Sequence, residues 1–403
     1  MLEEKINVLI VALHYYDSQE KKLLRVCKNG VSAAHHTLLN NLIKGLKAFS
    51  NVTILSSLPV GSFPCMTNHI VFPSCKREDG YEIGFINLPF IKDYIRQRAV
   101  KREILKWYNE QKNKNECYVL VYDSLYYLMQ GAVDAKKIAN EIKNVLIVPD
   151  LPGEYSVENK NYNKLIECGL KFKANKFFNI VKEFDAFIPL SKHMMNAMKV
   201  DDKPYLVVEC IVKEVKDHIP QIAENPVKKL MYAGELSKIV NVDLLLDAIE
   251  KIDNCQLYIC GRGPLEDYIK KKSETNHRIH YLGFIPKKEL EIVEKGIDIF
   301  INPRQNIGKY TKYSFPSKNA EYLLTGKPLV AYKLDGIPTE YGDFIYSPED
   351  NSIDALAKTI SRVLTLDYDT LLNMGIKQIE FMQGKSSVAQ GKRIVNFLKN
   401  LNK

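Results

Sequence analysis

Short apolar runs alternate with amphipathic stretches through the first half of the chain. Residues 6–13 form a continuous apolar run, which is typical of a central strand in a parallel sheet. An amphipathic stretch from about Ala33 to Phe49 predicts a helix. Further strands are predicted at residues 52–57, 82–88, 117–122, 145–148 and 186–189, with helical stretches between them. This alternation predicts a doubly wound α/β sheet.

The same pattern begins again near residue 228. Residues 207–226 lack a clear period and contain Pro220 and Pro226, which predicts an interdomain linker. Apolar runs at 228–233, 257–260, 297–302 and 328–332 then predict a second parallel sheet, and the tail from about residue 387 predicts a last helix. We therefore expect two domains, residues 1–208 and residues 209–385, followed by the helical segment 386–403.

Residues 311–330 lie between two predicted strands and predict a helix with readable ends. Ser314 is a candidate capping residue, Pro316 falls in the first turn, and Gly326 followed by Pro328 ends the helix. The helix is then about three turns long.

The exposed face of this helix carries the candidate chemistry. With Ala320, Leu323 and Leu324 toward the sheet, the side chains of Ser317, Lys318 and Glu321 share another side. A helix start with a lysine favours an anion, and a carboxylate one turn further can accept hydrogen bonds from a diol. A phosphate joined to a ribose fits this pattern. The alternative is an ordinary surface helix in which Glu321 pairs with Lys318.

Glycines mark three further loops at which the backbone can approach a ligand. Gly30 precedes the first helix, Gly234 follows a predicted strand, and Gly261 and Gly263 form a G-x-G-P-L turn before another helix. A plain helix-start glycine is the alternative at Gly30, because the G-x-G-x-x-G of a dinucleotide-binding turn is missing.

Asp150 follows a predicted buried strand in the sequence NVLIVPDLPGEY. Ligands of α/β sheets bind at the carboxyl ends of strands, so this carboxylate is placed where it could meet an acceptor hydroxyl. A loop-capping role for Asp150 is the alternative. His35 and His36 lie near another such loop, and no role is assigned to them.

Composition and charge narrow the class of protein. The chain has 403 residues with 46% hydrophobic and 26% charged residues, as ordinary soluble proteins do. Its net charge of +9 suits phosphorylated substrates or an anionic membrane face and does not require nucleic acid. The stretch 92–114 has eight basic residues against three acidic ones and an apolar face that includes Ile91. It predicts either a membrane-surface helix or a solvated helix covering the sheet.

No metal or cofactor is expected. The eight cysteines form no C-x-x-C pair and no zinc-ligand spacing, so we interpret them as reduced core residues. Asp367 and Asp369 form the only D-x-D considered as a metal site, and a helix cap explains it better. The acidic N-terminal start and the absence of a long apolar window predict a cytoplasmic protein, and the basic stretch leaves open a peripheral place on the inner membrane face.

The segment AEYLLTGKPLVA, with Glu321 in it, resembles the donor-binding segment of glycosyltransferase family four. The sequences NPR (302–304) and KYSFPSK (312–318) resemble a branch of capsule and exopolysaccharide transferases. This resemblance implies two Rossmann-like domains of the GT-B fold facing each other across a cleft, with the last helix crossing back to the first domain. It also implies that Glu321 holds the ribose of a nucleotide-sugar, that Gly261 and Gly263 lie beside the base, and that the anomeric configuration is retained.

The chain departs from the family pattern at several positions. Tyr313 stands where the family usually has a second glutamate, and Glu235 and Val240 replace two basic residues. Pro149 and Asp150 occupy a loop in which many members have a histidine. The positive charge that stabilises the leaving diphosphate is therefore expected from other residues, namely Arg304, Lys318 and Lys312.

The expected function is transfer of a sugar, a hexose or a related one, from a nucleotide-diphosphate sugar to a surface polysaccharide or lipid-linked saccharide. Residues 1–208 would bind the acceptor and residues 209–385 the donor. A non-catalytic subunit of the same fold, which stabilises a partner transferase, is the alternative suggested by the departures. A sugar-nucleotide epimerase of the same fold is less well supported, because no acid/base pair is evident.

Overall fold

The computed structural model describes residues 5–28, 33–89, 91–152, 164–214, 219–222 and 226–402. The chain forms two compact units. The first comprises Met1–Lys213, Lys312–Ser314 and Ser386–Lys403, and the second comprises Glu214–Thr311 and Phe315–Lys385. The predicted linker 207–226 lies partly outside the described residues.

The first unit is built on a seven-stranded sheet with the order β4-β5-β2-β1-β7-β8-β9. All neighbouring strands are parallel except β4 and β5, and the six strands without β4 follow the doubly wound order 3-2-1-4-5-6. The strands are β1 (Asn7–Leu13), β2 (Asn51–Ser57), β3 (Val71–Phe72), β4 (Cys75–Arg77), β5 (Gly80–Glu82), β6 (Phe85–Ile86), β7 (Cys117–Tyr122), β8 (Lys143–Val148) and β9 (Ala186–Pro189). The helices are α1 (Asp17–Val26), α2 (Ala33–Phe49), α3 (Ile91–Glu110), α4 (Tyr126–Lys136), α5 (Lys164–Ile180), α6 (His193–Met198) and α13 (Ser387–Asn400).

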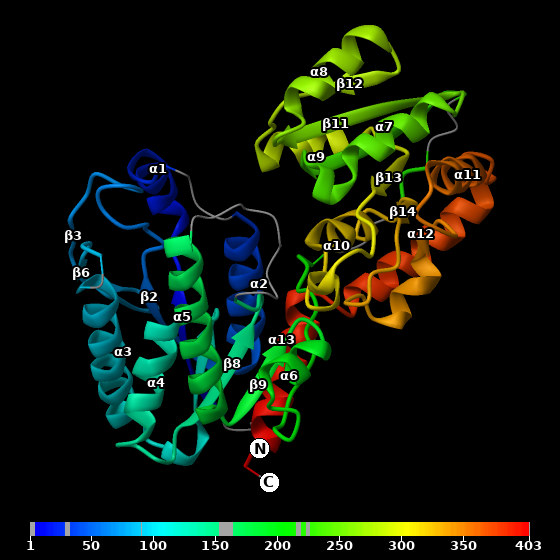
Figure 1. The fold of residues 1–403 in the computed structure, drawn as a ribbon. Coiled ribbons are helices and arrows are strands. Elements are labelled where there is room, and N and C mark those ends of the chain that lie inside the picture. The colour runs from blue at the N-terminus through cyan, green and yellow to red at the C-terminus, as the bar shows by residue number, and fades with distance from the viewer. Residues whose placement is uncertain are drawn as a thin grey trace. The chain divides into compact units, whose positions relative to one another are not determined.

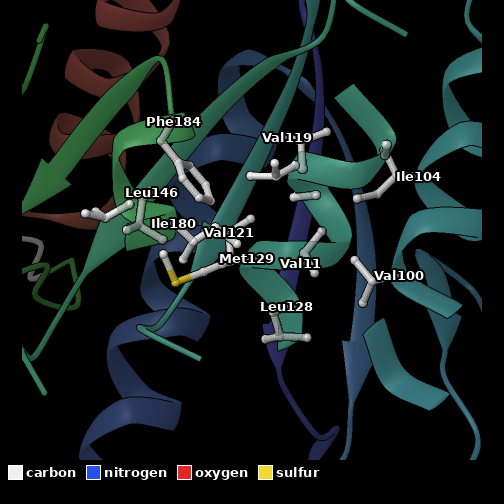
Figure 2. Packing of buried hydrophobic residues seen from close by; sticks show 14 of the residues in the cluster. Val11, Val100, Ile104, Val119, Val121, Leu128, Met129, Leu146, Ile180 and Phe184 are labelled. Carbon is white, nitrogen blue, oxygen red and sulfur yellow. The ribbon is translucent and has the colours of Figure 1, made fainter. Parts of the chain in front are cut away.

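Alternate residues of each strand pack against helices on opposite faces of the sheet, and because both faces are covered the strands are apolar throughout. Leu9 and Val11 of β1 pack with α3, α4 and α5 in one core, part of which is shown in Figure 2. Val8 and Ile10 pack on the other face with α2 and α13. The helical layers of this unit can be followed in Figure 1.

The predicted strand at 82–88 is wrong as a single element. Glu82 ends β5 of the main sheet, whereas β6 pairs antiparallel with β3 in a separate two-stranded ladder. The ladder is fixed to α3 by Arg96, which is buried, lies 3.7 Å above the ring of Phe85 and donates to the carbonyl of Leu58. Arg96 is therefore a buried residue that joins α3 to the ladder, and it is not part of a solvated basic face.

The last helix packs on the first unit, as expected: α13 lies along α2. Glycines allow the close approach. A Cβ atom on Gly45 would lie 2.0 Å from the carbonyl oxygen of Ser387, and one on Gly391 would lie 2.3 Å from the backbone of Gly45. Gln390 adds a buried hydrogen bond to the carbonyl of Cys210.

The second unit contains a six-stranded, fully parallel sheet with the order β12-β11-β10-β13-β14-β15, again 3-2-1-4-5-6 in chain order. Its strands are β10 (Lys228–Glu235), β11 (Cys255–Arg262), β12 (Ile279–Tyr281), β13 (Ile299–Asn302), β14 (Leu329–Ala331) and β15 (Ile345–Tyr346). Its helices are α7 (Val242–Glu250), α8 (Glu266–Thr275), α9 (Lys287–Lys295), α10 (Ser317–Leu323), α11 (Ile353–Leu364) and α12 (Tyr368–Gln383). The prediction of two doubly wound sheets is confirmed.

Helix α10 is shorter than predicted. It has 7 residues, its N-cap is Pro316, and no side chain caps it, so the predictions of a Ser314 cap and of three turns are wrong. The chain leaves the helix through Gly326, which has a φ of 71°. Ala320, Leu323 and Leu324 are buried as predicted. The buried Lys327 then donates to the carbonyls of Glu294 and Lys295 and so completes the end of α9.

Asp367 is a helix cap. Its side chain accepts a hydrogen bond of 2.8 Å from the amide of Thr370 at the start of α12, as the sequence predicted. Across the ranges that the structure describes, no three His, Cys, Asp or Glu side chains gather as a metal site would require. None of the helices in those ranges combines the length and the apolar character needed to span a membrane.

The glycine contact between α2 and α13 makes a stability prediction. Gly391→Ala forces a side-chain atom onto the backbone of Gly45, so we expect it to lower the free energy of unfolding by about 1–3 kcal/mol. Gly169→Ala in α5 is the matched control, because no atom of the described residues lies within 4 Å of the new Cβ, and it should stabilise by about 0.4–1 kcal/mol. Urea unfolding followed by circular dichroism measures both, and equal effects of the two substitutions would contradict this packing.

Candidate active site

The carboxyl edge of the second sheet is held together by main-chain hydrogen bonds between successive loops. Gly234 and Gly261 are direct neighbours at the ends of β10 and β11. Beyond them the amide of Leu236 donates to Arg262 and the amide of Leu265 donates to Leu236, both at 2.9 Å. The loops after β10 and β11 therefore form one rigid backbone surface.

Glycine is required at two points of this surface. A Cβ atom on Gly261 would lie 1.8 Å from the carbonyl oxygen of Gly234, and Gly261 has a φ of 144°. A Cβ atom on Gly263 would lie 2.3 Å from the carbonyl oxygen of Leu236. Contact between the two loops thus accounts for the G-x-G pattern without a ligand.

Helix α10 is fixed to the same edge through its buried side. The hydroxyl of Tyr322 accepts a hydrogen bond of 2.9 Å from the amide of Ala233, and its ring stacks on Phe300. Asn319 accepts a buried hydrogen bond of 2.7 Å from Asn302 at the end of β13. These anchors leave Ser317, Lys318 and Glu321 on the open side of the helix.

Glu321 lies between two lysines. One carboxylate oxygen is 2.7 Å from Nζ of Lys318, and the other is 3.7 Å from Nζ of Lys287 at the start of α9. The three side chains are partly exposed. The ammonium of Lys318 also acts on the end of β11, because its charge opposes the rise that burial causes in the pKa of Cys260. The predicted pairing of Glu321 with Lys318 is thus present, together with a second lysine that was not considered.

Arg304 follows β13 and lies over the ring of Tyr310, with its Cζ 4.7 Å from the ring centroid. Burial raises the pKa of Tyr232 in β10, and the positive charge of Arg304 opposes that rise. The Nε atom of Arg304 is buried and makes no hydrogen bond within the described parts of the chain. A cation with an unused donor therefore stands at the carboxyl edge of the sheet.

The other predicted donor residues are dispersed. Lys312 and Tyr313 belong to the first unit: the carbonyl of Lys312 accepts a hydrogen bond from Ser191, and Tyr313 packs against the core around α4. Glu235 ends β10 and accepts a hydrogen bond from Tyr232 through its carbonyl, and Val240 lies in a short 3-10 turn. Gly30 lies outside the described residues.

In the first unit, the carboxyl edge brings Asp150 to a histidine. Asp150 is the second residue after β8, which ends at Val148. Its carboxylate is 3.0 Å from Nε2 of His35 at the start of α2. This hydrogen bond raises the pKa of His35. The carbonyl of Asp150 also accepts a hydrogen bond of 2.7 Å from Ser124. Its side chain thus makes an ion pair with a histidine, whereas the alternative was a loop cap.

Asp123 adds a second carboxylate at this edge. It follows β7 directly, and its φ of 89° is unusual for a residue with a side chain. Burial raises the pKa of Asp123, His35 opposes the rise, and Asp150 adds to it. The three groups are therefore electrostatically coupled, and Asp123 is biased toward its protonated form.

Sequence reasoning missed His35, Asp123 and Lys287 as site candidates. Asp123 had a signal, because it follows a fully apolar strand as Asp150 does. His35 could be connected with Asp150 only through the strand order β1-β7-β8, which places the ends of these segments at one edge.

Comparisons with known proteins agree with the fold and identify one segment. Residues 227–366 match the family model for glycosyl transferases group 1. No curated protein sequence matches the chain.

Solved structures resemble the chain over almost its whole length at low identity. The lipopolysaccharide outer core galactosyltransferase WaaB has a TM-score of 0.62 at 13% identity, covering 98% of this chain and 99% of its own. A trehalose-6-phosphate synthase, studied for glycosyl transfer with retention, has a TM-score of 0.64 at 12% identity, covering 97% and 99%. The catalytic domain of starch synthase IV from Arabidopsis thaliana, bound to ADP and acarbose, has a TM-score of 0.61 at 11% identity, covering 99% and 100%. The chain therefore has the GT-B fold, and its segment 227–366 resembles the glycosyl transferases of group 1.

Proposed function

We propose that the protein transfers a sugar, a hexose or a related one, from a nucleotide-diphosphate sugar to a saccharide acceptor with retention of configuration. The single observation that carries the proposal is the group of cations around Glu321 within the segment that matches group 1 glycosyl transferases. The second unit would bind the donor and the first unit the acceptor. A growing surface polysaccharide or a lipid-linked saccharide is the acceptor class we propose, and no metal, cofactor or nucleic acid is required.

The reaction explains why cations are needed. The bond between the anomeric carbon and the diphosphate breaks, and the diphosphate leaves with the electron pair. Its growing negative charge is stabilised by fixed positive groups, which is the part we assign to Arg304 and Lys318. Arg304 suits this role because its buried Nε makes no hydrogen bond with the described residues.

The ion pairs of Glu321 are compatible with a ribose role. A diphosphate would compete with the carboxylate for Lys318 because it carries more charge. Glu321 would then keep Lys287 and could turn the released oxygen to a ribose hydroxyl. Donor binding thus exchanges one ion pair for another and leaves no charge unpaired. Ser317, which is exposed beside Lys318, can add a hydroxyl to the same anion, and Gly234, Gly261 and Gly263 supply the surface for close approach.

The acceptor side would use the carboxylates of the first unit. An acceptor hydroxyl must lose its proton when its oxygen forms the new glycosidic bond. Asp150 presents an exposed carboxylate held by His35, and Asp123 lies in the same electrostatic group. We therefore assign Asp150 as the catalytic residue that accepts this proton, with His35 holding its carboxylate in place.

The second candidate function is a non-catalytic subunit that stabilises a partner transferase. One observation favours it: Glu321 is already engaged by two lysines, as it would be in a purely structural helix. A panel of nucleotide-sugars distinguishes the two functions, because a non-catalytic subunit would neither bind nor slowly hydrolyse any of them.

The ribose assignment predicts a loss of affinity on Glu321→Gln. The substitution keeps the size of the side chain and removes the charge-assisted hydrogen bonds, so nucleoside diphosphate affinity should fall at least about 10-fold. Calorimetric titration with UDP, GDP and ADP measures it. Glu289→Gln in the first turn of α9 is the matched control, since it removes an exposed carboxylate from the same unit. Unchanged affinity in Glu321→Gln would remove the ribose role.

The charge assignment predicts a loss of turnover. Arg304→Ala and Lys318→Ala should each lower the rate of nucleotide-sugar hydrolysis about 10- to 100-fold, because each removes one cation that stabilises the leaving group. Lys309→Ala, an exposed lysine in the same connection, should leave the rate unchanged. If both site variants hydrolyse the sugar as fast as the unaltered chain, the stabilising charge lies elsewhere.

The pair of His35 and Asp150 predicts a titration. Asp150→Asn removes the hydrogen bond that raises the pKa of His35, so that pKa should fall, as seen in ring-proton NMR spectra. Since the pKa is raised in the folded state, the pair stabilises the fold below the unfolded-state value of about 6.5, and this stabilisation is lost as the pH rises through the folded-state pKa. His193 in α6 is the internal control, and a pKa of His35 that does not move would contradict the pair.

A further inference from the structure

The two-stranded ladder of β3 and β6 has one buried side and one exposed side. Val71 lies opposite Ile86, and Phe72 lies opposite Phe85. The two phenylalanines stack with their ring centroids 4.9 Å apart and are buried. Val71 and Ile86, on the other side, are 66% and 43% exposed. The ladder therefore presents two aliphatic side chains that nothing in the described residues covers.

The beginning of α3 extends this apolar surface. Ile91 and Tyr94 are 47% and 56% exposed, although the sequence pattern placed Ile91 on the core side. Helix α3 packs against β6, and Arg96 lies on the ring of Phe85, so the start of α3 lies beside the ladder. We call Val71, Ile86, Ile91 and Tyr94 the apolar face. Figure 1 shows β3 and β6 at the end of α3 where the helix begins.

Basic side chains border the apolar face. Arg98 follows Tyr94 by one turn, donates to its hydroxyl at 2.6 Å, and is exposed. Arg102 and Lys106 continue the exposed stripe along α3. Lys92 lies at the helix start, and its pKa is lowered by burial first, then by Arg96, and less by Lys173 of α5. The positive charge of α5 therefore reaches the same region.

Helix α5 repeats the combination of an aromatic and basic residues. Phe172 is 60% exposed, with Nζ of Lys176 at 4.6 Å from its ring centroid. Lys171 and Lys173 flank it and are exposed. Helix α3 has six basic residues against three acidic ones, Asp93, Glu103 and Glu110, and Glu103 is paired with Arg102 at 2.8 Å, which leaves the helix positive.

We propose that the apolar face and its basic border form a docking surface for an anionic lipid bilayer. Aliphatic and aromatic side chains would enter the headgroup region, and lysine and arginine would contact lipid phosphates. Exposed apolar residues alone would fit either a membrane or a protein partner. The excess of exposed basic residues favours the membrane, because its surface carries many phosphates. Each basic residue near such a surface contributes about fivefold in partitioning. The inference is independent of the transfer reaction, since lipid binding is measured without a sugar donor.

Vesicle co-sedimentation of the full chain tests the proposal. The protein should sediment with equimolar phosphatidylcholine and phosphatidylglycerol vesicles and much less with pure phosphatidylcholine, and added salt should weaken binding. The triple variant Val71→Thr, Ile86→Thr, Ile91→Thr should bind at least about 10-fold more weakly, and so should the double variant Arg98→Gln, Lys173→Gln. The matched control is Lys137→Gln with Ile138→Thr, an exposed basic and apolar pair at the end of α4, which should bind normally.

Three results would overturn the proposal. They are no binding to the anionic vesicles, equal binding to neutral ones, and binding that both variants leave unchanged. Circular dichroism checks that the variants fold. If the triple variant is unfolded, the charge variant alone decides, because Arg98 and Lys173 are surface residues whose replacement leaves the core intact.

Discussion

The close approach of Gly234 and Gly261 is the constraint on which the second unit depends. Only glycine allows the ends of β10 and β11 to pass so near each other, and the main-chain hydrogen bonds beyond them then join the two loops. Helix α10 is tied to the same point, because Tyr322 bonds to the amide of Ala233, the residue before Gly234. The positions of Lys318 and Glu321 are consequently set by backbone packing one strand away. A side chain at Gly261 would shift the polar face of α10 as well as the loop.

The cations at the carboxyl edge of the second sheet come from positions other than 235 and 240. Positions 235 and 240 carry Glu and Val. The positive charge of Arg304 nevertheless lowers the pKa of Tyr232 in β10, and that of Lys318 lowers the pKa of Cys260 in β11, both against the effect of burial. Both cations come from the segment after β13, which reaches the ends of β10 and β11 because the strand order is β11-β10-β13. In a doubly wound sheet, residues that follow different adjacent strands can therefore place their charges at the same edge.

The sequence predicted most strands, the helices α2 and α13, and the Asp367 cap, because apolar periodicity and cap chemistry are local signals. It failed where the outcome depended on partners distant in sequence. The predicted strand 82–88 is two strands in the structure, because Phe85 packs against Phe72 and Arg96. The length of α10 was overestimated, because Tyr322 and Asn319 fix this helix and no side-chain cap extends it. The donor candidates could be proposed from a single helix pattern and a family resemblance. Lys287 and His35 could not, since only tertiary contacts bring them to Glu321 and Asp150.

The first unit uses the same geometry with opposite chemistry. Its strand ends carry carboxylates whose surroundings shift pKa values in different ways. Burial favours the neutral form of Asp123, while the hydrogen bond with Asp150 favours the charged form of His35. A cluster in which pKa values are moved in different directions can contain both a hydrogen-bond donor and an acceptor, whereas an isolated carboxylate offers acceptors alone. Asp123 has a positive φ, a backbone conformation that costs free energy for a residue with a side chain, and it lies at this edge. Sugar hydroxyls need both kinds of partner, and the carboxylates at the carboxyl edge of β7 and β8 would repel an anionic diphosphate, which is why we propose the acceptor and not the donor for this edge.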